Sequence, residues 1–210
     1  MKTDDLIAAL SRDAALTGAP AARRLTLALA FSAAIAFALL MLVVKPRPDL
    51  ASAATTMLFD LKMVYVATLA ISAIALLRAV QRPEGVLSPL LLIVPAALIL
   101  FGLGHELATQ APAAFGPRLI GRNWALCLVA IPFLGAAPLA AILTAMTAAA
   151  PADPARAGAI AGFAAGAIAA VFYGMHCVDD SPLFVATWYT LAIGAMAVAG
   201  AAIGRRVLAW

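Results

Sequence analysis

The side chains that could do chemistry in this chain are few, and several of them stand together in the stretch HCVDDSPLF. His176 and Cys177 are adjacent, and Asp179 and Asp180 follow after one residue. The whole sequence has only two histidines and two cysteines, so this stretch holds one of each. A thiol and an imidazole can bind soft or borderline metal ions such as zinc or cadmium, and a pair of thiols can be oxidised to a disulfide.

The remaining candidates are Cys127, which follows Asn123 and Trp124, and His105, which precedes Glu106. Three interpretations of the cysteines stay open. They could form a redox or thiol-reactive sensor, or they could be small buried hydrophobic residues without a chemical role. They could also bind a metal, and the candidate ligands or supporting residues are then His176, Asp179, Asp180 and His105. Neighbouring residues on a helix point about 100° apart, so His176 and Cys177 could share an ion only where the helix frays.

Motifs for catalysis are missing from the sequence, because there is no glycine-rich phosphate loop, no HExxH and no nucleophile elbow. We therefore expect no enzyme and no catalytic residues. No cofactor is expected either, beyond transient binding of a soft metal ion at the cysteines. A disulfide between Cys127 and Cys177 would require their Cα atoms to lie within about 7 Å of each other.

The composition is typical of a membrane protein, because 65% of the residues are hydrophobic and only 11% are charged. A helix needs roughly 20 mostly apolar residues to cross a bilayer. Six stretches come near that length: 25–44, 58–77, 86–104, 124–146, 157–177 and 182–203. The first is too long for the hydrophobic part of a cleaved signal peptide. The predicted fold is an all-α integral membrane protein, with a six-helix transmembrane domain over residues 23–210 and a tail over residues 1–22.

The distribution of basic residues predicts the orientation of these spans. On the side of the termini lie Lys2, Arg12, Arg23, Arg24, Arg78, Arg82, Arg156, Arg205 and Arg206, and on the other side lie Lys45, Arg47, Lys62, Arg118 and Arg122. Nine against five favours both termini in the cytoplasm. Both cysteines and both histidines then lie at the outer surface. The basic residues flank the spans and form no patch with interleaved aromatic residues, so nucleic acid is not an expected partner.

Small residues recur at every fourth position of the fifth span, at Gly158, Gly162, Gly166, Ala170 and Gly174. Such a stripe allows two helix backbones to approach closely, so we expect tight helix packing there. The middle of every span lacks ionisable residues, which ion pathways usually need at depth. A small transporter or metal exporter is therefore an alternative with less support, and a membrane thiol oxidoreductase is a second one.

The tail carries the pattern of a short amphipathic helix. Thr3 can cap it, and Asp4 and Asp5 in its first turn complement the helix dipole. Leu6, Ile7 and Leu10 form an apolar stripe, with Arg12 and Asp13 away from it. The tail could bind a groove on a partner protein, lie on the membrane surface or be disordered, and all three remain open.

Four segments together resemble the NrsF-type anti-sigma factors of proteobacteria: TDDLIAAL at the start, GRNWALCLVAIPFLGAAPLAAI at 121–142, HCVDDSPLFVATWY at 176–189 and GRRVLAW at the end. The resemblance implies six membrane spans that hold an extracytoplasmic-function sigma factor inactive at the inner membrane. It also implies release of that factor under heavy-metal or oxidative stress, sensed through Cys127 and Cys177. The segment from Thr3 to Leu10 would contact the sigma factor.

Overall fold

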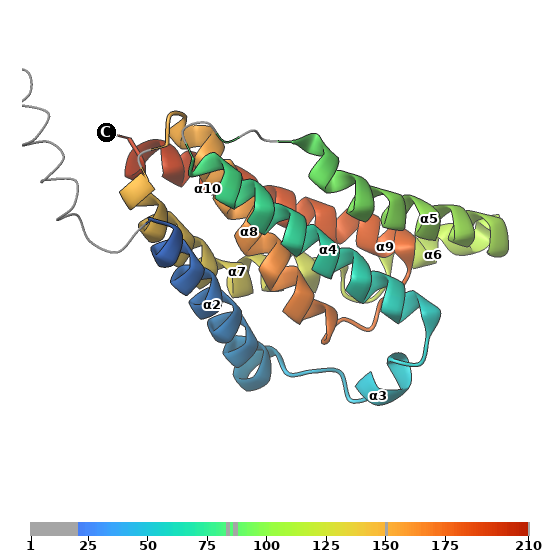
Figure 1. Ribbon diagram of the computed structural model, residues 1–210. Coiled ribbons are helices and arrows are strands. Elements are labelled where there is room, and N and C mark those ends of the chain that lie inside the picture. The colour runs from blue at the N-terminus through green and yellow to red at the C-terminus, as the bar shows by residue number, and fades with distance from the viewer. Residues whose placement is uncertain (1–20, 83–84, 86–87, 150, 210) are drawn as a thin grey trace, which may run out of the picture.

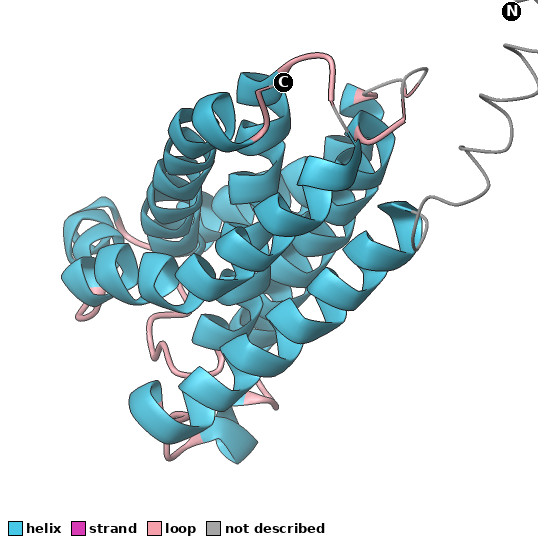
Figure 2. Ribbon diagram, turned by 90° about the vertical axis from the view of Figure 1, so that its left-hand side faces the viewer, coloured by secondary structure: helices cyan, strands magenta, loops and turns pink. Residues whose placement is uncertain are grey.

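The computed structural model describes residues 21–82, 85, 88–149 and 151–209. Six helical segments are long and apolar enough to cross a membrane: Ala21–Val44, Met57–Val80, Pro89–Thr109, Pro112–Ala149, Pro154–Gly174 and Pro182–Val207. The described residues contain no β-strand, and Figure 2 shows a bundle of helices joined by loops at its two ends. The prediction of an all-α, six-helix membrane fold is confirmed. The tail residues 1–20 lie outside the described part.

The helices follow one another with short connections. They are α2 (Ala21–Leu39), η1 (Leu40–Val44), α3 (Leu50–Ala53), α4 (Met57–Val80), η2 (Pro89–Leu92), α5 (Ile93–Thr109), η3 (Pro112–Ala114), α6 (Phe115–Ile120), α7 (Trp124–Met146), η4 (Thr147–Ala149), α8 (Pro154–Gly174), α9 (Pro182–Phe184), η5 (Val185–Tyr189) and α10 (Thr190–Val207). The segments η1 and η5 are π-helical turns, which occur frequently at functional sites.

Helix α8 forms the centre of the bundle. It packs against α10, α7 and α4, and α2 covers α7 (Figure 1). In the most hydrophobic stretch of the α8 segment 72% of the residues are buried, against 17% in the α5 segment. Helix α5 therefore lies at the periphery, where most of its apolar side chains face outward.

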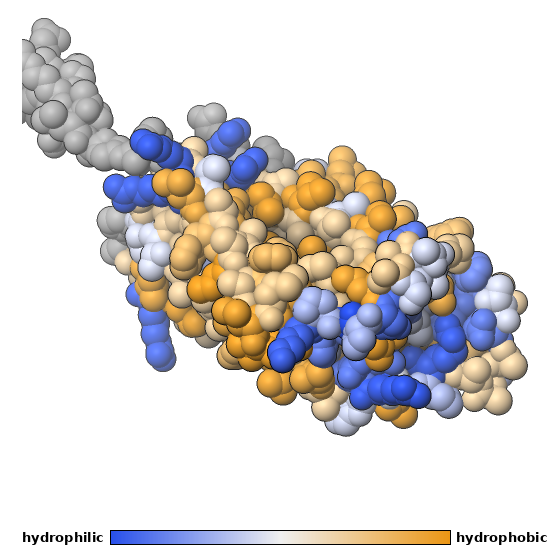
Figure 3. All heavy atoms as spheres, turned by 90° about the horizontal axis from the view of Figure 1, so that it is seen from below, coloured by the Kyte–Doolittle hydropathy of each residue, from blue (hydrophilic) through white to orange (hydrophobic). Residues whose placement is uncertain are grey.

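Charged and apolar residues separate along the bundle as a membrane requires. Figure 3 shows hydrophobic residues across the middle and hydrophilic residues gathered towards the two ends. The start of α2 and the C-terminal residues share one end, and the α8–α9 connection lies at the opposite end (Figure 1). An even number of spans places the two termini on the same side.

Two of the helix boundaries that differ from the expected ones affect the candidate site. Helix α5 continues to Thr109, so His105 and Glu106 lie within its last turns. Helix α8 ends at Gly174, three residues earlier than expected, because the carbonyl of Met175 accepts a 3.0 Å hydrogen bond from the backbone N–H of Arg47 instead of continuing the helix. His176 and Cys177 therefore belong to a loop.

The glycine stripe of α8 faces two neighbouring helices. A Cβ atom on Gly158 would lie 2.2 Å from the carbonyl oxygen of Gly200, and one on Gly162 would lie 2.0 Å from that of Met196, so both glycines are in backbone contact with α10. The nearest atom to a Cβ on Gly166 would be Met196 Cβ at 3.1 Å, and on Gly174 it would be Met63 Sδ of α4 at 2.9 Å. Close backbone packing is what holds helices together where lipid removes the hydrophobic driving force.

We predict that Gly162→Ala destabilises the bundle by about 2 kcal/mol, because the methyl group must push α10 away from α8. The matched control is Gly194→Ala on α10, where a Cβ atom would meet nothing within 4 Å. Thermal unfolding of both variants in detergent, followed by circular dichroism, measures the difference. Equal melting temperatures for the two variants would contradict the close α8–α10 contact.

Candidate functional site

The candidate site is built around the α8–α9 hairpin, which we define as residues 175–181. This hairpin lies at the end of the bundle that also carries α3 and α6 (Figure 1). Three carboxylates, those of Asp179, Asp180 and Glu106, each connect it to a different part of the protein. Cys177 belongs to the hairpin itself, and Cys127 lies in the first turn of α7 (Trp124–Met146).

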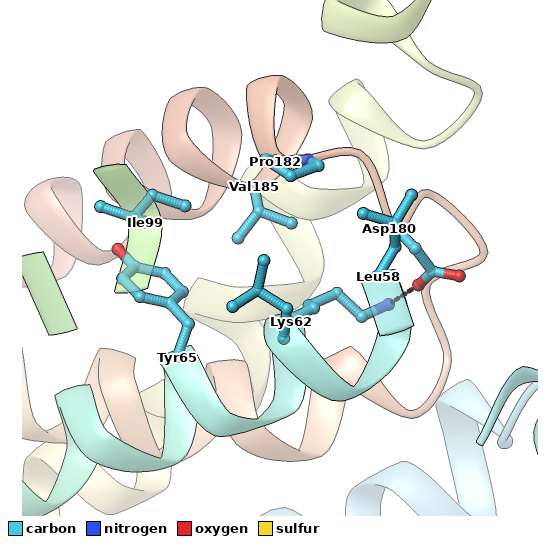
Figure 4. A pocket seen from close by; sticks show the side chains of 8 residues that line it. Leu58, Lys62, Tyr65, Ile99, Asp180, Pro182 and Val185 are labelled. Carbon is cyan, nitrogen blue, oxygen red and sulfur yellow. Dashed lines mark hydrogen bonds and ion pairs between the residues drawn. The ribbon is translucent and has the colours of Figure 1, made fainter. Parts of the chain in front are cut away.

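Asp180 connects the hairpin to α4 and to the loop after η1. Its carboxylate forms ion pairs with Lys62 and with Arg47, whose Nη1 lies 2.9 Å from Oδ2. The side chain of Lys62 is only 1% exposed and that of Arg47 only 8%. Figure 4 shows Lys62 extending from α4 to the carboxylate, with apolar side chains such as Tyr65 and Val185 beside it. Both cations therefore pair with the same acidic side chain in a place with little water.

Lys62 also holds the backbone of the hairpin. Its Nζ donates a 2.8 Å hydrogen bond to the carbonyl oxygen of Cys177. Arg47 makes a second ion pair, 2.7 Å long, with the exposed carboxylate of Asp49. Its hydrogen bonds to Asp49 and Asp180 raise the pKa of Arg47 above its ordinary value, although burial lowers it. The two cations thus fix the position of residues 177–180 through their ion pairs with Asp180 and their hydrogen bonds to the Cys177 carbonyl oxygen.

Asp179 connects the hairpin to the start of α7. Its carboxylate accepts hydrogen bonds from the backbone N–H groups of Arg122, at 3.1 Å, and Asn123, at 2.9 Å. The N–H groups at the start of a helix have no hydrogen-bond acceptors within the helix. Here the carboxylate of an acid from another loop is the acceptor. Gly121 has φ +59°, and a Cβ atom there would lie 2.8 Å from Asp179 Cγ, so only glycine lets the carboxylate approach.

Glu106 connects the hairpin to α5 and α6. Its carboxylate is nearly fully buried and accepts hydrogen bonds from Ser181 Oγ at 2.7 Å and from the backbone N–H of Leu183 at 2.8 Å. It also pairs with Arg118 of α6. Ser181 caps the helical turn that begins at Pro182.

Both cysteines are fully buried and both are free thiols. The Cys127 thiol donates a hydrogen bond to the hydroxyl of Tyr173 at 3.4 Å. Cys177 Sγ lies 3.8 Å from the carbonyl oxygen of Asp179. The thiols are close enough to affect each other's ionisation: the interaction with Cys127 and the charge of Lys62 lower the pKa of Cys177 to about 7, against the effect of burial. The structure therefore brings together two residues that are 50 positions apart in the sequence.

Neither histidine joins the cysteines. His176 Nδ1 lies 2.7 Å from the carbonyl oxygen of Lys45, and its ring packs on Tyr173 with centroids 5.6 Å apart. His105 lies on α5 beside Phe101, with ring centroids 6.5 Å apart. Over residues 21–82, 85, 88–149 and 151–209, no group of three or more His, Cys, Asp and Glu side chains could hold a metal ion. The predicted ligand candidates are thus engaged in hydrogen bonds, ion pairs and packing.

Sequence reasoning missed the roles of Lys62, Arg47 and Glu106. The signal for Lys62 was present, because a lysine within an apolar span is expensive and usually has a partner and a function. Its partner could not be read from the sequence, since Asp180 is 118 residues away. The proposed partner-binding residues Thr3, Asp4, Asp5, Leu6, Ile7 and Leu10 lie outside the described part of the chain.

We predict that Asp180→Asn lowers the free energy of unfolding by about 3 kcal/mol, because it leaves buried Lys62 without a charged partner. Asp49→Asn is the matched control, because Asp49 is the other acid that pairs with Arg47 and its side chain is 53% exposed. It should change the stability little. Chemical or thermal denaturation in lipid nanodiscs compares them, and an equal loss in both variants would refute the importance of the buried pair.

Comparison with known proteins places this architecture in a family. The family described as "Negative regulator of sigma F" (NrsF) matches residues 10–210. The "Probable anti-sigma-F factor NrsF" of Azospira oryzae is 34% identical over 217 residues, which cover 100% of both chains. The "Anti-sigma-F factor NrsF" of Caulobacter vibrioides is 32% identical, again over 100% of both chains. No solved structure matches. The chain belongs to the NrsF family of negative regulators of sigma F.

Proposed function

We propose that this protein is an anti-sigma factor of the bacterial inner membrane. It binds a sigma factor of the extracytoplasmic-function class through its cytoplasmic N-terminal segment and keeps it from the transcription machinery. Heavy-metal or oxidative stress, sensed by Cys127 and Cys177, releases the sigma factor. The observation that carries this proposal is the match over the full chain to relatives named anti-sigma-F factors. These names favour a regulator over a transporter or a thiol oxidoreductase.

The charge distribution supports a cytoplasmic tail. The start of α2 carries Arg23 and Arg24, and the same end of the bundle carries the arginines near the ends of α4, α8 and α10, namely Arg78, Arg82, Arg156, Arg205 and Arg206. Among the described residues, none of these arginines forms a salt bridge within the chain. At the opposite end Arg47, Lys62 and Arg118 are paired with acids, whereas Lys45 and Arg122 form no salt bridge with described residues. The larger number of unpaired basic residues at the first end supports a cytoplasmic position for that end.

The thiols support sensing at the opposite end. A hydroperoxide can oxidise Cys127 and Cys177 to a disulfide, taking two electrons and two protons from the thiols and leaving an alcohol and water. A soft metal ion could bridge the same two sulfurs, although the described residues offer no third His, Cys, Asp or Glu ligand. Oxidation is therefore the signal that the geometry favours.

The hairpin offers a route from the thiols to the tail. A covalent bond between Cys177 and Cys127 would draw residues 175–181 towards α7 and strain the contacts of Lys62 with Cys177 and Asp180. Because α4 and α8 run from the hairpin to the basic end of the bundle, a change in their packing would reach the segment that precedes α2. Such a switch requires a real difference in interaction energy between the two packed states.

We predict that the double substitution Cys127→Ser/Cys177→Ser preserves repression and abolishes the response to oxidant. Serine keeps the size of each side chain but cannot form a disulfide. The measurement is a reporter of the sigma factor's promoter in cells exposed to hydroperoxide, with membrane levels of the protein checked by immunoblot. Full induction in the double variant would eliminate the two thiols as the sensor.

We further predict that Leu6→Asp/Leu10→Asp releases the sigma factor permanently, because charge on the apolar stripe prevents docking in a groove. Arg12→Ala/Asp13→Ala, on the opposite face of the predicted helix, is the matched control and should keep repression. Copurification of the sigma factor with the full-length membrane protein tests both variants. Equal retention of the sigma factor would move the binding site to other cytoplasmic loops.

A further inference from the structure

The two thiols differ in their surroundings. Cys127 lies in the first turn of α7 with its sulfur against the Tyr173 hydroxyl. Cys177 lies in the hairpin, directly before the exposed Val178. A surface hollow of about 620 Å³ is lined by the four residues that follow Cys177, together with Pro117, Arg118, Gly121 and Arg122. A small opening of the hairpin would therefore connect this hollow with Cys177.

Charge also distinguishes the two sulfurs. Lys62 from α4 donates to the carbonyl oxygen of Cys177 at 2.8 Å, and Arg47 Nη1 lies 3.5 Å from the same oxygen. The groups that face Cys177 are Lys62 from α4, Arg47 from the loop after η1, Cys127 from α7, Tyr173 from α8, Tyr189 from η5, and Asp179 and Asp180 from the hairpin. Asp179 has its partners at the start of α7, and Asp180 pairs with Lys62 itself. The positive charge of Lys62 nevertheless acts on the Cys177 sulfur and favours its thiolate.

We propose that Cys177 is the thiol that reacts first, that Lys62 is the positioning residue that stabilises its thiolate, and that Cys127 then completes a disulfide. This inference rests on the proposed thiol sensing and names the order of its steps. It also assigns a chemical role to Lys62. The ion pair of Lys62 with Asp180, taken alone, would give this residue only a structural role.

The two steps balance with a hydroperoxide as the oxidant. The Cys177 thiolate attacks the terminal oxygen, so that an S–O bond forms, the O–O bond breaks, and the leaving alkoxide takes a proton to become an alcohol. Cys127 then attacks the sulfenic sulfur. An S–S bond forms, the S–O bond breaks, and hydroxide leaves with the proton of Cys127 as water. The sulfurs lose two electrons in total.

The pKa of Cys177, lowered to about 7 by Cys127 and by Lys62, supports this order. The thiolate is the nucleophilic form of a cysteine, and a lowered pKa makes it more abundant at Cys177 than at an ordinary thiol. No cation among the described residues makes a hydrogen bond or ion pair at Cys127. The reaction should thus begin at the hairpin and end at α7.

The test is alkylation of the full-length protein in lipid nanodiscs with limiting iodoacetamide between about pH 5.5 and pH 10. Mass spectrometry quantifies Cys177 and Cys127 separately. In the wild-type protein Cys177 should be labelled first. In Lys62→Met the midpoint of its pH–rate profile should shift upward. At pH 7 Cys177 of Lys62→Met should be labelled about threefold more slowly than in the wild-type protein, because a less acidic thiol is less often present as thiolate. Above both midpoints it should be labelled about threefold faster, because the thiolate of a less acidic thiol is more nucleophilic.

Two further variants separate a chemical role of Lys62 from a structural one. Ser181→Ala loosens the hairpin without removing a charge, so it should change the rate by a common factor at every pH and leave the midpoint in place. Lys62→Arg retains the positive charge and should restore the wild-type midpoint. If Lys62→Met does not fold, Lys62→Gln removes the positive charge while keeping a polar side chain beside Asp180 and the Cys177 carbonyl oxygen, and an upward shift of the midpoint is again expected.

An unchanged midpoint in the folded Lys62 variant, or labelling of Cys127 before Cys177, would overturn the proposal. Failure of the sensing function would look different. Cells carrying the Cys127→Ser/Cys177→Ser variant would still respond to oxidant, while the pH profile of the purified protein would depend on Lys62 as expected. The two results are therefore independent.

Discussion

The pairing of buried Lys62 with Asp180 is the interaction on which the rest of the site depends. A lysine ammonium group within an apolar span costs several kcal/mol of desolvation unless an acid and hydrogen bonds compensate it. Here the compensation comes from a single loop: the carboxylate of Asp180 and the carbonyl of Cys177. The cost of exposing Lys62 to the apolar surroundings thus keeps the hairpin folded back over α4, and it holds Cys177 at the end of the bundle beside Cys127.

The same principle recurs at the other two carboxylates of the site. Asp179 provides acceptors for the unpartnered N–H groups at the start of α7, and buried Glu106 does so for Ser181 and Leu183. A hairpin of seven residues (175–181) is therefore coupled by directional polar contacts to α4, to α5 and to the start of α7. Hydrogen bonds and ion pairs that are shielded from water are strong and directional. A chemical change at one sulfur should therefore break some of these contacts and form others, because small continuous shifts of the hairpin would leave them unsatisfied. This property suits the sensing role that we propose for the hairpin.

Packing within the membrane complements this polar end. The backbone contacts of Gly158 and Gly162 with α10 make the central helix pair close and stiff, whereas α5 lies at the periphery with few buried residues. Movement of the hairpin is thus expected to pass along α4 and α8 as displacement of whole helices. The family to which the chain belongs regulates a sigma factor, which requires communication between a membrane and the transcription machinery.

The sequence by itself determined the six spans, the close-packing glycines and the position of both cysteines at one end of the bundle. The spans follow from the length of each hydrophobic stretch, and the packing glycines follow from their four-residue spacing. The common end of the cysteines follows from counting the spans, since each span crosses the bilayer in the direction opposite to the one before it. It could not determine where α8 ends, which depends on a hydrogen bond from Arg47 to Met175 across 128 residues. Nor could it assign Lys62, Asp179, Asp180 and Glu106 to their partners. Those assignments belong to the tertiary structure, because a buried charge selects whichever partner the packed helices bring within a few ångströms, and that proximity is not encoded in any single segment.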